Sequence, residues 1–200
     1  MRIIVIGGTG TIGSAVVTAL AARHEVIAVG QKNGTYRVDL ASPESIARMF
    51  QAVGTFDTLV SAAGRAAFAS LEKLTDADFQ LGLSNKLMGQ VNLVRIGQQF
   101  INDGGSFTLT SGVLSREPMK GSAAISMVNA GLEGFVRAAA LELPRGIRIN
   151  VVSPPWVTET LIARKMDPAP GMPAAAVAQA YVTSVEGTAT GHTIDPRSMR

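Results

Sequence analysis

Residues 3–13 read IIVIGGTGTIG, and this stretch decides the fold that the whole sequence predicts. A short apolar strand runs into a glycine-rich turn, and a helical pattern follows at once. Such a turn places free backbone N–H groups and the positive end of a helix dipole against a phosphate. We therefore predict a dinucleotide-binding site, whose residues at this turn are Gly7, Thr9, Gly10, Thr11, Ile12 and Gly13. The alternative, a glycine turn with no ligand, is disfavoured by the strand and helix that flank it.

Each glycine of the motif has a separate predicted role. Gly7 allows the tight turn, Gly10 lets a pyrophosphate approach the backbone, and Gly13 lets the helix pack closely on the strand.

The end of the second predicted strand bears on the choice of cofactor. It reads VGQKN at residues 29–33, without an acid to bind an adenosine ribose. A carboxylate there favours NAD, whereas a basic residue favours the 2′-phosphate of NADP. Gln31 and Lys32 are therefore candidate contacts, and NADP is predicted over NAD. The alternative is that Lys32 is an ordinary solvated loop lysine.

Short apolar runs alternate with segments of helical period along the rest of the chain, as in a parallel sheet covered on both faces. The crossover rule then favours a single α/β domain over residues 1–200, a doubly wound, mostly parallel seven-stranded Rossmann fold. The predicted strands are Ile3–Ile6, Val26–Val29, Tyr36–Val38, Thr58–Ser61, Ser106–Thr110, Ile149–Val152 and His192–Ile194.

Helix signals lie between these strands. Ile12, Val16 and Leu20 form one apolar stripe, and residues 42–44 (Ser-Pro-Glu) give an N-cap with proline in the first turn. Further helices are predicted at Asp78–Phe100, Ala123–Leu143 and Ala174–Val185. Residues 167–173 form an irregular proline-rich loop, which is either a substrate lid or a plain connection.

Composition excludes several classes of function. The chain has no cysteine and only two histidines, so disulfides, thiolate sites and histidine-rich metal sites are excluded, and no metal is predicted. The net charge of +3 is not gathered into a basic run, and few aromatic residues are present, so no nucleic-acid partner is expected. No apolar stretch is long enough to span a membrane. We expect a soluble cytoplasmic protein.

Several short motifs, in order, resemble the short-chain dehydrogenase/reductase family over nearly the whole chain. They are the glycine turn, VDL at 38–40, AAG at 62–64, LTS at 109–111, NAGLEGF at 129–135, ALEL at 140–143 and RINVVSP at 148–154. The resemblance implies that Asp39, with Leu40, contacts adenine, and that residues Ala62, Ala63 and Gly64 line the adenosine side. Pro154 to Thr160, including Val157, would lie along the nicotinamide. Asp39 has the alternative role of capping the next helix, and Pro155 replaces a common glycine, which stiffens the backbone.

The catalytic residues depart from the family's pattern. Family members have a serine and then a Tyr-x-x-x-Lys motif, in which the tyrosine transfers a proton and the lysine lowers its pKa. Alignment places Ile125 at the tyrosine position and Asn129 at the lysine position. The two tyrosines of the chain, Tyr36 and Tyr181, are predicted on the third strand and the last helix, so neither is a substitute.

Three polar residues remain as catalytic candidates. Ser111, at the end of the fifth strand, is predicted to hydrogen-bond a substrate carbonyl. Family members also have an asparagine on the preceding helix. Lys86 occupies that position, by its spacing to Gly89, unless a one-residue slip puts Asn85 there. With Asn129 in the lysine position, the two polar groups would be exchanged across one pocket, and burial would let Lys86 deliver a proton. The alternative is a surface lysine on a helix.

These observations favour an oxidoreductase that transfers hydride between NADP(H) and a small carbonyl or alcohol. The runner-up is a non-catalytic NADP(H)-binding sensor or partner subunit, which the missing tyrosine and lysine favour. An epimerase or methyltransferase fits less well. The apolar residues of the Asp78–Phe100 and Ala123–Leu143 helices exceed what one sheet face covers, which predicts a homodimer or homotetramer.

Overall fold

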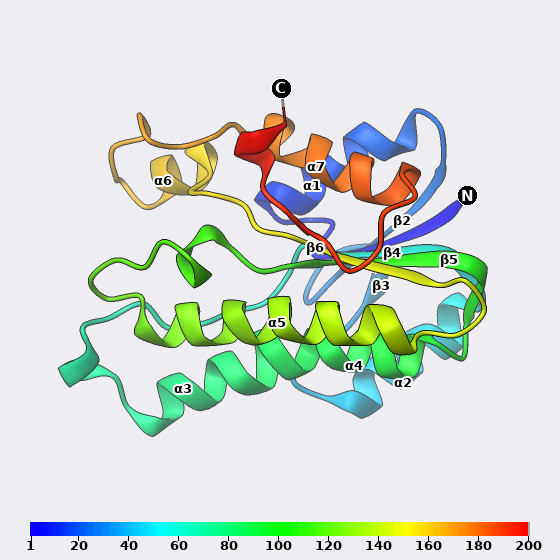
Figure 1. Cartoon of the computed structure of the whole chain (residues 1–200), viewed down its shortest axis with the longest axis horizontal. Helices are drawn as coiled ribbons and strands as arrows, with labels where there is room; N and C mark the ends of the chain where they lie inside the picture. The colour runs from blue at the N-terminus through cyan, green and yellow to red at the C-terminus, as the bar shows by residue number, and fades with distance from the viewer. Residues whose placement is uncertain (200) are drawn as a thin grey trace.

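The computed structural model describes residues 1–199 and shows a parallel sheet between two layers of helices (Figure 1). The sheet order is β3-β2-β1-β4-β5-β6-β7, and every pairing is parallel. The predicted doubly wound α/β fold is therefore confirmed. The strands are β1 (Arg2–Ile6), β2 (Glu25–Gly30), β3 (Tyr36–Arg37), β4 (Phe56–Ser61), β5 (Ile101–Thr110), β6 (Arg148–Val152) and β7 (Thr193–Ile194).

The strand order reverses between β1 and β4, and this reversal determines where a ligand can bind. After β1 the chain adds strands on one side, and from β4 onward it adds them on the other. Ile6 pairs with Ser61 at the carboxyl ends of these two strands, and the Ala62 amide donates to the Ile6 carbonyl. The connections that leave β1 and β4 therefore diverge from a common point, which is where open α/β sheets bind ligands.

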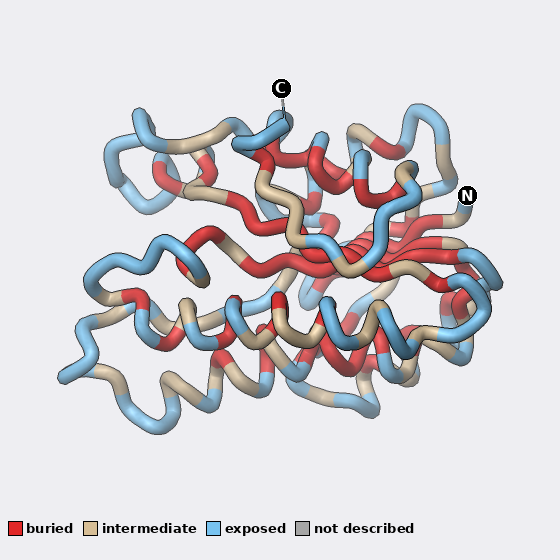
Figure 2. Tube along the Cα trace, in the orientation of Figure 1, coloured by how far each residue is buried: buried red, intermediate tan, exposed pale blue. Residues whose placement is uncertain are grey.

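Helices cover both faces because each buries an apolar stripe against the sheet (Figures 1 and 2). One face carries Ile46 of α2, Leu93 of α4 and Val136 of α5, and the other carries Val16 of α1 and Val177 of α7. No helix within residues 1–199 has both the length and the apolar character needed to cross a membrane. The helices are α1 (Thr11–Ala21), α2 (Pro43–Val53), α3 (Asp76–Gly82), α4 (Met88–Gly97), α5 (Ala123–Glu142), α6 (Thr158–Ala163) and α7 (Ala174–Glu186).

The predicted long helix, roughly Asp78–Phe100, is present as an unbroken helical run but differs in its bounds and in one internal turn. It begins at Asp76, because Thr75 and Asp78 form a capping box, and α4 ends at Gly97. A π-helical turn at Leu83–Leu87 separates α3 from α4. A wide turn of this kind does not alter the apolar period enough to be seen in sequence, and such turns often occur at functional sites.

Other boundaries also differ from the predictions. β5 begins at Ile101, five residues before the predicted Ser106. The sequence did not predict these residues as strand, because residues 102–104 lack the apolar side chains that mark a buried strand and are exposed. β3 ends at Arg37 rather than Val38. The short α6 was not predicted, whereas residues 167–173 are irregular as expected, apart from a single bridge between Met172 and Val157.

The capping box that begins α3 gives a test of the fold. Thr75→Ala removes the hydroxyl that accepts from the Asp78 amide, so we expect about 1 kcal/mol less unfolding free energy. For a chain of this length that is a fall in Tm of roughly 2–4 °C. Thr75→Ser keeps the hydroxyl and should remain close to the wild type. Identical urea unfolding curves for Thr75→Ala and the wild type would show that the box contributes nothing.

Candidate functional site

The glycine turn after β1 brings the backbone at Gly13 very close to the carbonyl group of Gly7. Gly7 has φ +78°, a conformation that favours glycine, and its amide donates to the Val29 carbonyl at 2.7 Å. A Cβ on Gly13 would lie 2.0 Å from the Gly7 carbonyl oxygen, so only glycine fits there. At Gly10 a Cβ would meet nothing closer than that same oxygen at 3.3 Å. The turn is therefore tightly packed between Gly7 and Gly13, whereas there is more space beside Gly10.

The N-terminus of α1 suits an anion. Its N-cap is Gly10, which supplies no side-chain acceptor, and the first turn holds no acidic residue. The amides at a helix start are donors without intrahelical partners, and the helix dipole adds a partial positive charge there. Phosphate oxygens are the ligand chemistry that fits this arrangement.

Two cavities meet at the end of β4, beside this turn. The first, about 310 Å³, is bounded by the glycine turn and the end of β2. The second, about 260 Å³, is bounded by the ends of β5 and β6 and by α5. Both are lined by Ala62, Ala63 and Gly64, so together they form one elongated site. Of the predicted residues, the first cavity is also lined by Gly7, Thr9, Gly10, Gln31 and Leu40, and the second by Ile12, Lys86, Ser111, Asn129, Pro154 and Val157.

Four predicted cofactor residues do not line either cavity. Thr11 and Gly13 belong to the start of α1, and Lys32 is exposed in the loop after β2. Asp39 is exposed, and its carboxylate accepts the Ala41 amide at 3.0 Å, so it helps to order the turn before α2, which is close to its alternative predicted role as a helix cap.

Arg65 lines the first cavity and was missed in the sequence. Its amide donates to the Asn85 side-chain oxygen at 2.8 Å, which fixes the backbone next to Gly64. Its position immediately after the AAG motif is the sequence feature that could have identified Arg65 as a cavity residue. The sequence does not show, however, which way the loop after that motif turns.

Lys86 is a buried amine on the wall of the second cavity. The residue is 8% exposed, and its Nζ donates to the Ser111 carbonyl at 3.1 Å. Burial lowers the pKa of Lys86 to about 8, because the ammonium loses its hydration. Since the Asn85 side chain is bonded to the Arg65 amide, Lys86 is the residue of this turn that enters the second cavity.

Asn129 faces the same cavity from α5. Its Nδ2 donates to the Gly112 carbonyl at 3.3 Å, while its Oδ1 is buried without a hydrogen-bond partner. An unsatisfied buried acceptor is costly, so it indicates a donor that a ligand would supply. Lys86 and Asn129 thus donate to the successive carbonyls of Ser111 and Gly112, which is the predicted placement of two polar groups around one pocket.

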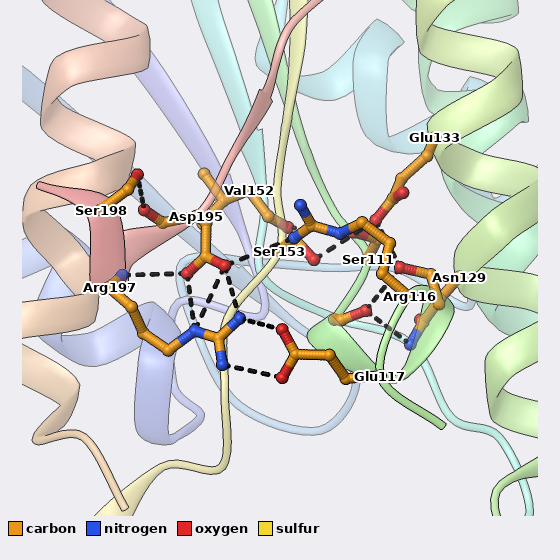
Figure 3. A network of polar contacts seen from close by, with 12 residues as sticks. Ser111, Arg116, Glu117, Asn129, Glu133, Val152, Ser153, Asp195, Arg197 and Ser198 are labelled. Atoms are coloured by element: carbon orange, nitrogen blue, oxygen red, sulfur yellow. Dashed lines mark hydrogen bonds and ion pairs between the residues drawn. The ribbon is translucent and has the colours of Figure 1, made fainter. Parts of the chain in front are cut away.

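The Ser111 hydroxyl is directed away from the role predicted for it. It donates to Oε1 of Glu133 at 2.9 Å, inside the protein (Figure 3). A serine has one O–H donor, so this proton is not free for a substrate carbonyl. Glu133 was noticed in the sequence only as part of the NAGLEGF motif, since its contact with Ser111 spans 22 positions.

Neither tyrosine of the chain reaches the site. Tyr181 is fully buried under the sheet, its hydroxyl is 2.7 Å from that of Thr110, and burial raises its pKa. Tyr36 lies on β3, at the edge of the sheet. Ile125 lines the second cavity, and within residues 1–199 the only ionisable side chain in that lining belongs to Lys86.

Comparisons with known proteins agree with this geometry. A short-chain dehydrogenase/reductase family model, described as enoyl-(acyl carrier protein) reductase, matches residues 11–190. The crystal structure of the protein lin1944 from Listeria innocua is similar with a TM-score of 0.94 and 41% identity, over 98% of each chain. The crystal structure of a small-chain dehydrogenase in complex with NADPH is similar with a TM-score of 0.85 and 25% identity, over 98% of this chain and 95% of that one.

A curated relative gives a shorter match. The short-chain dehydrogenase/reductase ATR9 of Stachybotrys chlorohalonatus is 35% identical over 109 residues, which are 53% of this chain and 43% of the relative. The alignment therefore covers less than half of that relative's length.

The buried amine predicts how stability depends on pH. Below pH 8 the folded and unfolded chains both carry the ammonium, so the folded state bears its full desolvation cost. Between pH 8 and 10.5 the folded chain loses the proton and the unfolded chain keeps it, so the cost decreases as pH rises. Lys86→Met should therefore stabilise the protein, relative to the wild type, by about 2–3 kcal/mol more at pH 7 than at pH 10.

Urea unfolding at both pH values measures this difference. Lys32→Met, at an exposed lysine, is the control and should show no such change with pH. An effect of Lys86→Met that is equal at pH 7 and pH 10 would mean that Lys86 titrates alike in the folded and unfolded chains.

Proposed function

The chain belongs to the short-chain dehydrogenase/reductase family, and on that premise we propose that it transfers hydride between NADP(H) and a small carbonyl or alcohol substrate. The observation that carries the proposal is the pair of cavities joined at the end of β4, with the start of α1 between them and the sheet's reversal beneath. An elongated site at this place in a doubly wound sheet matches a dinucleotide.

The residues present fit such a cofactor. The closed turn between Gly7 and Gly13 and the open face of Gly10 suit a pyrophosphate, the 310 Å³ cavity suits adenosine, and the 260 Å³ cavity suits nicotinamide. The unpartnered Oδ1 of Asn129 would accept from a ribose hydroxyl. When bound, the nicotinamide supplies or takes up the hydride.

The lining of the first cavity supports NADP over NAD. It contains no aspartate or glutamate to accept from a ribose 2′-hydroxyl, whereas Gln31 and Arg65 are both present. A guanidinium pairs well with phosphate oxygens, so Arg65 is the candidate contact for a 2′-phosphate. The similar small-chain dehydrogenase that was crystallised with NADPH points the same way.

We assign the proton transfer to Lys86. When a hydride adds to a carbonyl carbon, the carbonyl oxygen must gain a proton, and in the alcohol oxidation the same proton is removed. Lys86 is buried at the cavity wall, and its pKa of about 8 suits an acid that works near neutral pH. The Ser111 hydroxyl is already donated to Glu133, so it does not compete for this role.

The wall around Lys86 favours a substrate with an apolar body. Ile125, Leu114, Val157 and Trp156 line the cavity, and the last of these is packed against Phe68 with ring centroids 6.0 Å apart. An apolar pocket with a few placed polar groups is typical of small-ligand sites. We expect small apolar aldehydes and ketones to be better substrates than charged ones.

The alternative function is a non-catalytic NADP(H)-binding sensor. The observation in its favour is Ile125, which has no proton to transfer at the position where the family has tyrosine. The two functions share the cofactor site and differ only in turnover.

Binding of NADPH is tested first, with alanine substitutions at two glycines, one that has no room for a Cβ and one that has. Gly13→Ala must displace the turn, since its Cβ would overlap the Gly7 carbonyl, and we expect at least a roughly 10-fold weaker Kd for NADPH by nicotinamide fluorescence. Gly134→Ala is the matched control, because a Cβ there meets only the end of Arg137 at 3.9 Å. A wild-type protein that does not bind NADPH at millimolar concentration would exclude the proposed function.

Turnover is tested next with a panel of aldehydes, ketones and quinones, followed by loss of nicotinamide absorbance. Lys86→Met should lower kcat by roughly 10²–10⁴-fold, the usual loss on removing a general acid, with a much smaller change in the Kd for NADPH. Lys73→Met, at an exposed lysine, should leave both unchanged. Tight NADPH binding without oxidation by any member of the panel would favour the sensor.

A further inference from the structure

Glu133 is a buried carboxylate that the proposed chemistry does not use. It is 5% exposed, and within residues 1–199 no lysine, arginine or histidine nitrogen lies within salt-bridge distance of it. Three serine hydroxyls converge on its Oε1, from Ser111 at 2.9 Å, Ser115 at 2.7 Å and Ser153 at 3.3 Å. Figure 3 labels Glu133 with Ser111 and Ser153. A buried charge is expensive, and apolar residues often replace buried ions without loss of stability, so packing alone does not explain Glu133.

The three serines belong to different segments around the second cavity. Ser111 immediately follows β5, Ser115 lies in the short 3-10 helix Val113–Ser115, and Ser153 immediately precedes Pro154 in the cavity wall. Glu133 itself follows Asn129 by one turn of α5, so both lie on the same face of that helix. One oxygen atom therefore joins α5 to both strand ends that form the cavity.

Ser111 connects this carboxylate to Lys86. Its hydroxyl donates to Glu133, while its backbone carbonyl accepts from the Lys86 Nζ. The serine is thus held from both sides, and its carbonyl is the hydrogen-bond partner that the structure gives to the buried amine. The Ser111 amide also donates to the Val152 carbonyl at 2.9 Å, so loss of the Glu133 contact would leave this backbone bond to hold the residue whose carbonyl accepts from the amine.

We propose that Glu133 is a positioning residue, which acts through Ser111 to hold the Lys86 amine at the wall of the cavity. Its consequence for turnover rests on the proposed function, whereas the positioning is a property of the protein without cofactor. Ser115 and Ser153 serve the same carboxylate but do not contact Lys86, so they distinguish an effect through Ser111 from a general loosening of the site.

The test measures how accessible the Lys86 amine is, in the protein without NADPH. Reductive methylation by formaldehyde and cyanoborohydride is followed at Lys86 by peptide mass spectrometry, with exposed Lys32 as the internal reference. Glu133→Ala and Ser111→Ala should each raise the Lys86/Lys32 rate ratio by about 3- to 10-fold, the coupling expected between groups in one hydrogen-bond network. The double variant should show no more than the larger single effect, because both act on one contact.

Two further variants separate positioning from general damage. Glu133→Gln keeps an acceptor oxygen for the serines and should return the ratio to within about 2-fold of the wild type. Val136→Ala, in the core on the next turn of α5, loses stability by leaving a cavity and should not change the ratio. Ser153→Ala should not change it either.

An unchanged ratio in both Glu133→Ala and Ser111→Ala would overturn the proposal. Equal increases in Val136→Ala or Ser153→Ala would do the same, since they would reveal general loosening. Ser111→Ala removes a single oxygen atom and keeps the test decisive if Glu133→Ala does not fold. Because no cofactor is present, a failure of the wild type to bind NADPH would count against the proposed function and leave this result intact.

Discussion

The close approach of Gly13 to the Gly7 carbonyl is the contact on which the site depends. It holds the start of α1 directly against the end of β1, so close that only a residue without a Cβ fits at position 13. Since β1 lies beside β4, the same contact places the helix start next to Ala62 and Gly64, where the two cavities meet. The positive end of a helix and the two cavities are thereby brought to one place by a backbone constraint rather than by a side-chain interaction.

Much of the fold could be predicted because short stretches of sequence determine it locally. The strand, turn and helix of residues 3–13, the N-cap at Ser42 and the apolar face of α5 are each contained in one short stretch. The errors arose where structure is not local. The π-helical turn at Leu83–Leu87 is a change of one residue in a helical period, and the start of β5 at Ile101 depends on pairing with Phe56 rather than on its own sequence.

The site shows the same division between local and long-range information. The position of Lys86 and Asn129 around one cavity could be predicted, since the resemblance to the family's motifs assigned each of them to a position there. The direction of the Ser111 hydroxyl could not, because its acceptor lies on α5, far along the chain. Arg65 was missed for a similar reason: the sequence shows which residues follow a strand but not which of them line the cavity.

Ile125 and Lys86 line the same cavity, and most of the side chains around them are apolar. Burial there lowers the pKa of Lys86, because the ammonium loses its hydration. The same desolvation that makes the amine costly to bury therefore makes it a better acid near neutral pH. An amine in this state is useful only if its direction is fixed, because a mobile lysine would turn to solvent to recover its hydration. The Ser111 carbonyl provides that direction, and behind it three serine hydroxyls supply hydrogen bonds to the buried Glu133 side chain.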